Sequence, residues 1–131
     1  MFLTKECDYA IRVIRSLADM QQKTAKIICD QEVIPLQYSY KILKRLEKAG
    51  IVTTCRGTTG GYRLSKPADS LTLFDVVNAV SKNIFVSECL RPTSECPHQT
   101  DGNVCSVHQE FCRIQNIVID ALREKAISQV F

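Results

Sequence analysis

The stretch GIVTTCRGTTGGYRLSK, residues 50–66, constrains the fold of this chain more than any other segment. Two runs rich in strand-forming residues, 51–56 and 62–64, flank a turn that contains three glycines. Strand formers joined by a glycine-rich turn predict a β-hairpin. The segments before it have helical periodicity instead, so the hairpin belongs to a mainly α fold with a small β element.

Three helices are expected before the hairpin. Apolar residues recur at helical spacing over about 4–21, and a second, shorter helix covers 25–32. Pro35 blocks continuation of that helix but suits the first turn of a third, over 36–49, which ends at Gly50. The residues that the third helix directs inward are Ser39, Ile42, Leu43 and Leu46. Two helices that meet at a tight turn, followed by a hairpin, are the order of a winged helix-turn-helix domain.

The basic charge of the chain lies in the same half as these helices. Residues 1–66 hold 12 Lys plus Arg against 6 Asp plus Glu, whereas residues 67–131 hold 5 against 8. A phosphate-facing module joined to a module that does not bind nucleic acid has this distribution, and surface charge for solubility is the alternative explanation.

The exposed face of the third helix and the hairpin carry the residues expected to contact DNA. The major groove admits one helix, while a hairpin lies along the backbone or in the neighbouring minor groove. Gln37 and Tyr40 lie early on the helix, where side chains reach base edges. Lys41, Lys44 and Arg56 are placed for phosphates. The expected contacts are Gln37, Tyr38, Tyr40, Lys41, Lys44, Arg56, Gly60, Gly61 and Arg63, with Arg45 and Lys48 on the same outer face.

Each of these features has a second explanation when it is taken alone. The helix face is also explained as an ordinary solvated surface, and the hairpin as a capping β element. Gly60 and Gly61 would let the backbone approach phosphates closely. A helix-turn-helix followed directly by a basic hairpin favours DNA binding over the two separate explanations.

Four of the seven cysteines and both histidines lie between Glu88 and Cys112. Six residues separate Cys89 from Cys96 and eight separate Cys96 from Cys105, with prolines and a glycine that break regular structure. Such a loop can wrap an ion or a cluster, and its spacing matches neither zinc ribbons nor ferredoxins. Thiolates suit zinc and iron–sulfur clusters equally. The residues alone therefore leave three alternatives open: a zinc site, an iron–sulfur cluster or free thiols.

Three segments carry a family resemblance: MFLTKECDYAIRVIRSLA, GIVTTCRGTTGGYRLSK and LTLFDVVNAV. Together with the three-cysteine loop they resemble the Rrf2 family of bacterial winged-helix transcription regulators, which includes the IscR and NsrR types. The resemblance implies a homodimer on a two-fold, double-stranded DNA operator. It also implies a [2Fe-2S] or [4Fe-4S] cluster held by Cys89, Cys96 and Cys105, although some relatives lack the cysteines. For the fourth ligand it offers either His108, as in the IscR type, or Asp8 reaching from the partner subunit, as in the NsrR type.

The last helix is expected from near Val107 to about Ser128, with an apolar stripe too wide for one helix to bury alone. The stripe packs either on its own winged domain or against a second subunit, and the length of the helix favours the second subunit. We therefore expect a winged helix-turn-helix domain over 1–82, a cysteine-rich cluster-binding loop over 83–106 and a dimerisation helix over 107–131.

The remaining features narrow the function. Charged residues near the N-terminus interrupt any secretory signal and no stretch is long enough for a membrane span, so we expect a cytoplasmic protein without a membrane partner. No nucleotide-binding glycine loop or Ser/His/Asp arrangement indicates an enzyme. The leading hypothesis is a regulator that senses iron–sulfur, redox or nitric oxide status. The alternative is a zinc- or cluster-binding structural or electron-carrying module without regulatory DNA binding.

The other cysteines and the second histidine are expected to play no part in the site. Cys7, Cys29 and Cys55 lie in amphipathic segments and are interpreted as packing residues. Cys112 lies one turn after His108, where a ligand is conceivable but a core residue is favoured. His98, next to a proline, is expected to be exposed to solvent.

Overall fold

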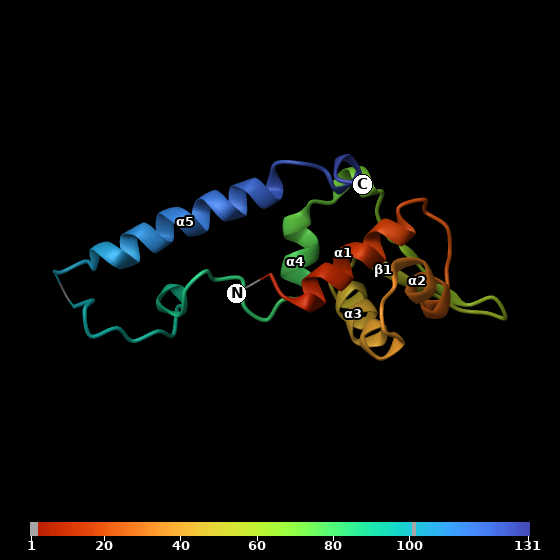
Figure 1. The fold of residues 1–131 in the computed structure, drawn as a ribbon, viewed down its shortest axis with the longest axis horizontal. Coiled ribbons are helices and arrows are strands. Elements are labelled where there is room, and N and C mark those ends of the chain that lie inside the picture. Colours follow the sequence, from red (N-terminus) through yellow and green to blue (C-terminus); the bar gives the residue numbers. More distant parts are fainter. Residues whose placement is uncertain (1–2, 101) are drawn as a thin grey trace.

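The computed structural model describes residues 3–100 and 102–131 (Figure 1). The α-helices are α1 Lys5–Leu17, α2 Ala25–Glu32, α3 Leu36–Lys48, α4 Leu73–Val80 and α5 Ser106–Arg123. The strands are β1 Val52–Cys55 and β2 Gly61–Leu64, and the 3-10 turns are η1 Ala68–Ser70, η2 Glu88–Leu90 and η3 Ile127–Gln129. The predicted mainly α fold with one small hairpin is confirmed.

The winged helix-turn-helix forms as the sequence predicts. Thr24 caps α2 by accepting a hydrogen bond from the Ile27 N–H, and Val33 ends that helix in the left-handed conformation. Pro35 is the N-cap of α3, so the two helices meet at a short turn. The side chains predicted to face inward from α3 are buried, each at most 1% exposed: Ser39, Ile42, Leu43 and Leu46. The three apolar ones, Ile42, Leu43 and Leu46, join residues of α1, α2 and α4 in one core.

The hairpin is attached to the connection between α1 and α2. The strands pair antiparallel, with Val52 opposite Leu64. Beyond the hairpin, the Lys23 N–H donates to the Tyr62 carbonyl at 2.9 Å, and the Tyr62 N–H donates to the Lys23 carbonyl at 2.8 Å. A Cβ on Gly61 would lie 2.6 Å from the Lys23 carbonyl oxygen, closer than real Cβ atoms approach other atoms. Gly61 is therefore required where β2 meets this connection.

Two predicted helices are shorter in the structure. The first ends at Leu17 rather than near residue 21, because Asp19 accepts from the Gln21 N–H and Met20 takes a left-handed conformation. The last ends at Arg123 rather than near residue 128. Beyond it, the chain turns back and buries Ile127 completely in the core. A tertiary contact therefore ends the last helix.

The molecule is elongated (Figure 1). The tip of the hairpin and the N-terminal end of α5 lie towards opposite ends of its long axis, with α4 between them. Helix α4 packs on α1, α3 and α5, and its eight residues begin with a capping box between Thr72 and Asp75. In the described part of the chain, no helix has the length and apolar character needed to cross a bilayer.

Candidate nucleic-acid surface and cysteine site

The exposed face of α3 carries most of the residues expected to contact DNA. Tyr40 is 56% exposed and Tyr38 44%, and Gln37, Lys41 and Lys44 are exposed as well. On the hairpin side, Arg56 directly follows β1, Gly60 lies in the turn, and Gly61 and Arg63 lie in β2. Arg56 and Arg63 are both exposed. The Thr54 hydroxyl donates to Glu47 near the end of α3, so β1 is fixed beside this helix.

Arg45 does not point outward, contrary to the sequence prediction. Its side chain is 21% exposed, and Nη1 donates to Glu6 Oε2 at 2.7 Å and to the Val80 carbonyl at 2.6 Å. The contact joins α3 to the N-terminal turn of α1 and to the end of α4. The prediction failed because both partners are more than 30 residues away in the chain.

Lys41 is exposed but has an acidic partner. Its Nζ donates to Glu6 Oε1 at 2.6 Å. The hydrogen bond from Lys41, with a smaller effect of Arg45, lowers the pKa of Glu6 despite the opposing effect of partial burial. The carboxylate is therefore ionised at neutral pH and carries the charge that these two cations face.

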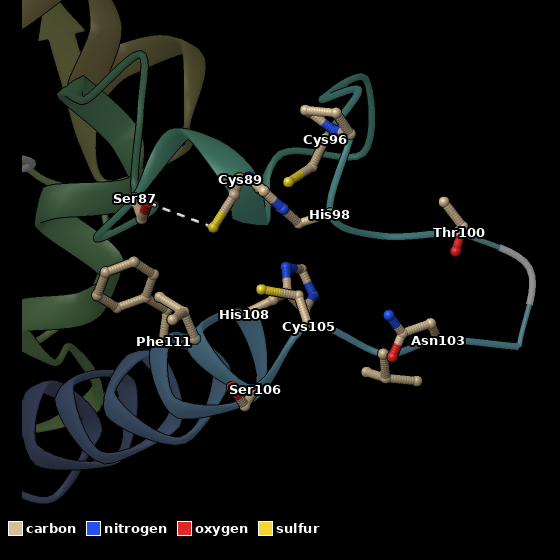
Figure 2. Close-up of a pocket in the computed structure, with 13 residues that line it drawn as sticks. Ser87, Cys89, Cys96, His98, Thr100, Asn103, Cys105, Ser106, His108 and Phe111 are labelled. Atoms are coloured by element: carbon tan, nitrogen blue, oxygen red, sulfur yellow. Dashed lines mark hydrogen bonds between the residues drawn. The ribbon is translucent and has the colours of Figure 1, made fainter.

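The three predicted cysteine ligands line one open cavity of about 1070 Å³ (Figure 2). Cys89 lies in η2, Cys96 lies in the irregular loop and Cys105 is the N-cap of α5. Figure 2 shows Cys89 and Cys96 on one side of the opening and Cys105 and His108, from the start of α5, on the other. Residues separated by 19 positions in the chain are therefore brought to one site.

The donors around this cavity are half-buried. None of the three thiols is in a disulfide, and Cys89 Sγ lies 3.4 Å from the Ser87 hydroxyl. Across residues 3–100 and 102–131, no three His, Cys, Asp or Glu side chains are grouped closely enough to hold a single ion. The three thiols thus line one open cavity without converging on a single point.

His108 has an unsatisfied atom at this site. Its Nδ1 is buried and has no hydrogen-bond partner among the residues that the structure describes. An orphaned buried polar atom costs about 1–3 kcal/mol, so in native proteins such an atom usually has a partner, for example an ordered water or an ion. Imidazole nitrogen is a metal ligand. The residues around the cavity therefore fit a metal-containing group with thiolate and imidazole ligands.

Asp8, the alternative fourth ligand, does not line the cavity of its own chain. It lies on α1, its side chain is 52% exposed, and it pairs with Arg12 at 3.0 Å. Any ligand role of Asp8 requires a second subunit.

The remaining cysteines and His98 are placed largely as predicted. Cys7 and Cys29 are buried in the core, at 1% and 6% exposure, which confirms them as packing residues. Cys55 is half-buried on β1, and Cys112 is half-buried and does not line the cavity. His98 is exposed, as predicted, although it lies on the rim of the cavity.

Sequence reasoning missed one residue that positions the cysteine loop. Gln115 is 7% exposed on α5. Its Oε1 accepts from the Val86 N–H at 2.7 Å and its Nε2 donates to the Ile84 carbonyl at 2.9 Å. Gln115 thus ties the segment before Cys89 to α5. The sequence feature that could have indicated this role is a glutamine within the apolar stripe of the last helix.

Comparisons with known proteins agree on one family. The family described as "Rrf2: Iron-dependent Transcriptional regulator" matches residues 3–131. The protein aau3 of Rhizobium meliloti (strain 1021) is 37% identical over 100 residues, 74% of this chain, and the match spans 65% of the length of aau3. The HTH-type transcriptional regulator IscR of Vibrio vulnificus (strain YJ016) is 26% identical over 133 residues, covering 99% of this chain and 77% of that protein.

A solved structure has the same fold. CymR, described as the global cysteine regulator of B. subtilis, superimposes with a TM-score of 0.75 at 19% identity. The superposition covers 97% of this chain and 93% of CymR. The fold similarity therefore extends beyond the winged helix-turn-helix to the last helix.

Proposed function

The chain belongs to the Rrf2 family of DNA-binding transcriptional regulators. We propose that it is a cytoplasmic homodimer that senses iron–sulfur, redox or nitric oxide status through an iron–sulfur cluster. The observation that carries the proposal is the cavity lined by Cys89, Cys96, Cys105 and His108, whose Nδ1 is buried without a hydrogen-bond partner among the described residues. Relatives with this fold are regulators, not enzymes, in agreement with the absence of a catalytic motif in the sequence.

Four residues of this chain fit the ligand set. Cys89, Cys96 and Cys105 would hold a [2Fe-2S] or [4Fe-4S] cluster through thiolates, the ligands that such clusters take in proteins. His108 Nδ1 is supported as fourth ligand because a bond to iron would satisfy a buried atom that has no partner among the described residues. Asp8 of the partner subunit is the alternative. When bound, the cluster would supply a centre that reacts with nitric oxide and oxidants, and the assembly of this centre would depend on the supply of iron.

An ultraviolet–visible spectrum of protein purified without oxygen tests the cofactor directly. Sulfur-to-iron charge-transfer bands in the visible region are expected. A colourless protein with stoichiometric zinc would replace the cluster with the zinc alternative. A module without regulatory DNA binding is not supported, because the family consists of transcriptional regulators.

For DNA, we propose that α3 enters the major groove and the hairpin follows the backbone. Gln37, Tyr38 and Tyr40 on the first turns of α3 would face base edges. The phosphate contacts would come from Lys41, Lys44, Arg56, Gly60, Gly61 and Arg63.

Removing a hairpin cation should weaken binding to every duplex. In the variant Arg56→Ala we expect lower affinity for operator and random duplexes alike, because a phosphate contact is independent of sequence. The slope of log affinity against log salt should become less negative by about 0.9, the value for one phosphate contact on B-DNA. Fluorescence anisotropy over a salt series measures both quantities.

Tyr40→Ala serves as the contrasting variant. Because Tyr40 is placed for base edges, its loss should change sequence preference more than the salt slope. Unchanged operator binding by Arg56→Ala would contradict this docking.

The exposed apolar face of α5 supports the homodimer. Val107 is 56% and Ile117 53% exposed, and Phe111, Ile114 and Val118 are only half-buried. A two-fold dimer would cover this face and place two copies of α3 on one side of the duplex. The division into a winged domain over 1–82, a cluster loop over 83–106 and a dimerisation helix over 107–131 remains part of this proposal.

Introducing a charge on this face should separate the subunits. Ile117→Glu is expected to raise the dissociation constant of the dimer by about tenfold or more, because an unpaired carboxylate would be buried at the interface. Sedimentation equilibrium measures the constant. Asn116→Glu, at the adjacent exposed position, is the matched control and should leave the dimer intact. A wild-type protein that sediments as a monomer would rule out the dimer.

A further inference from the structure

A single carboxylate faces two cations of the DNA-reading helix. Glu6, in the first turn of α1, accepts from Lys41 through Oε1 at 2.6 Å and from Arg45 through Oε2 at 2.7 Å. The Glu6 side chain is 30% exposed. Both of its oxygens are thus occupied by side chains of α3, in the way that phosphate oxygens would be.

The two cations are held differently. Arg45 is 21% exposed and also donates to the Val80 carbonyl, so it stays in place whether or not Glu6 is charged. Lys41 is 55% exposed, and Glu6 is the partner found for it among the described residues. Its ammonium sits on a flexible four-carbon stem and can move to another anion. Of the two, Lys41 is therefore the cation that DNA could take from Glu6.

We infer that Glu6 competes with DNA phosphate for Lys41 and so restrains sequence-independent binding. The inference rests on the proposed docking of α3 in the major groove. Lys41 reaches phosphate only when it leaves Glu6, so every complex that uses this contact loses the ion pair of the free protein.

Neutralising Glu6 should strengthen binding. For Glu6→Gln we expect affinity for a random-sequence duplex about 1.4- to 5-fold higher, the range that corresponds to a surface ion pair. The salt slope should become steeper, by at most about 0.9. Anisotropy titrations over a salt series, with full-length proteins prepared in the same cofactor state, give both values. Thermal unfolding of each variant checks that the fold is retained.

The decisive comparison uses a double variant. In a Lys41→Ala background, Glu6→Gln should no longer raise the affinity, because no competition remains. Glu110→Gln is the matched control, since it removes the same charge and breaks the exposed pair with Arg113 on α5. It should leave the affinity unchanged.

The outcomes separate this inference from the proposed function. If Glu6→Gln raises affinity equally with and without Lys41, its effect is general electrostatics and the competition is refuted. Equal binding by wild type and Glu6→Gln also refutes it and leaves the DNA docking standing. Failure of both proteins to bind any duplex would overturn the docking itself and the inference with it.

Discussion

Replacing Cys89, Cys96 and Cys105 together by alanine is expected to abolish the visible chromophore and, with it, any response of operator binding to nitric oxide or oxidant. The three thiols line one cavity, and two of them come from a loop while the third begins α5. Losing them removes the ligands that would tie loop and helix together. Because coupling between two sites typically amounts to 1–3 kcal/mol, the operator affinities of wild type with and without the cluster should differ by about 5- to 150-fold. The triple variant should show a single affinity.

The remaining cysteines provide the controls. Cys112→Ala changes a half-buried thiol one turn beyond His108 and outside the cavity, so both chromophore and response should persist. Replacing Cys7, Cys29 or Cys55 should likewise affect neither. A triple-alanine variant that keeps its visible absorbance and its signal response would show that these three cysteines are not the ligands. Single His108→Ala and Asp8→Ala variants then distinguish the two candidates for the fourth ligand.

Substituting Gly61 by alanine is expected to lower the free energy of unfolding by about 1–3 kcal/mol, the usual effect of overpacking a tight contact. The new Cβ would lie 2.6 Å from the Lys23 carbonyl oxygen and 2.8 Å from its carbon, and both are backbone atoms that cannot rotate away. The strand must move, which breaks the paired hydrogen bonds between Lys23 and Tyr62. The hairpin would be displaced from α3, so affinity for DNA should fall as well. Urea unfolding and anisotropy measure the two effects.

Thr58→Ala, in the turn of the same hairpin, is the matched control. Thr58 is exposed, and surface substitutions of this kind change stability by at most about 0.5 kcal/mol. Wild-type stability in Gly61→Ala would mean that the hairpin and the α1–α2 connection are not held together as described.

Local patterns predicted the winged helix-turn-helix well. The bounds of α2, the start of α3 and its four inward side chains follow from helical periodicity and Pro35, which act over a few residues. The C-terminal ends of α1 and α5 were predicted wrongly, because the turn at Asp19 ends α1 and the burial of Ile127 ends α5. Helix α4 was not assigned at all. Its eight residues are too short for a clear period, although the capping box of Thr72 and Asp75 was readable.

The candidate site likewise has a part that the sequence predicted and a part that it did not. Cysteine spacing and resemblance predicted that Cys89, Cys96 and Cys105 share one site, and the structure places all three around one cavity. The contacts of Glu6 and Gln115 join elements 29 to 39 residues apart in sequence. No local pattern encodes such contacts, because they depend on how the elements pack. The residues that hold the site in place were therefore harder to predict than the residues that line it.

The part of the chain after α4, described at 81–100 and 102–126, is attached at both ends of α4. It leaves α4 where Arg45 holds the Val80 carbonyl, and it returns where the Ile127 N–H donates to the Leu71 carbonyl at 2.7 Å. At 1.5 Å per residue, the 18 residues of α5 span about 27 Å and the eight of α4 about 12 Å. Helix α5 is thus roughly twice as long as α4. A displacement of the cysteine loop relative to α5 would therefore act on both ends of α4, the helix that packs on α3.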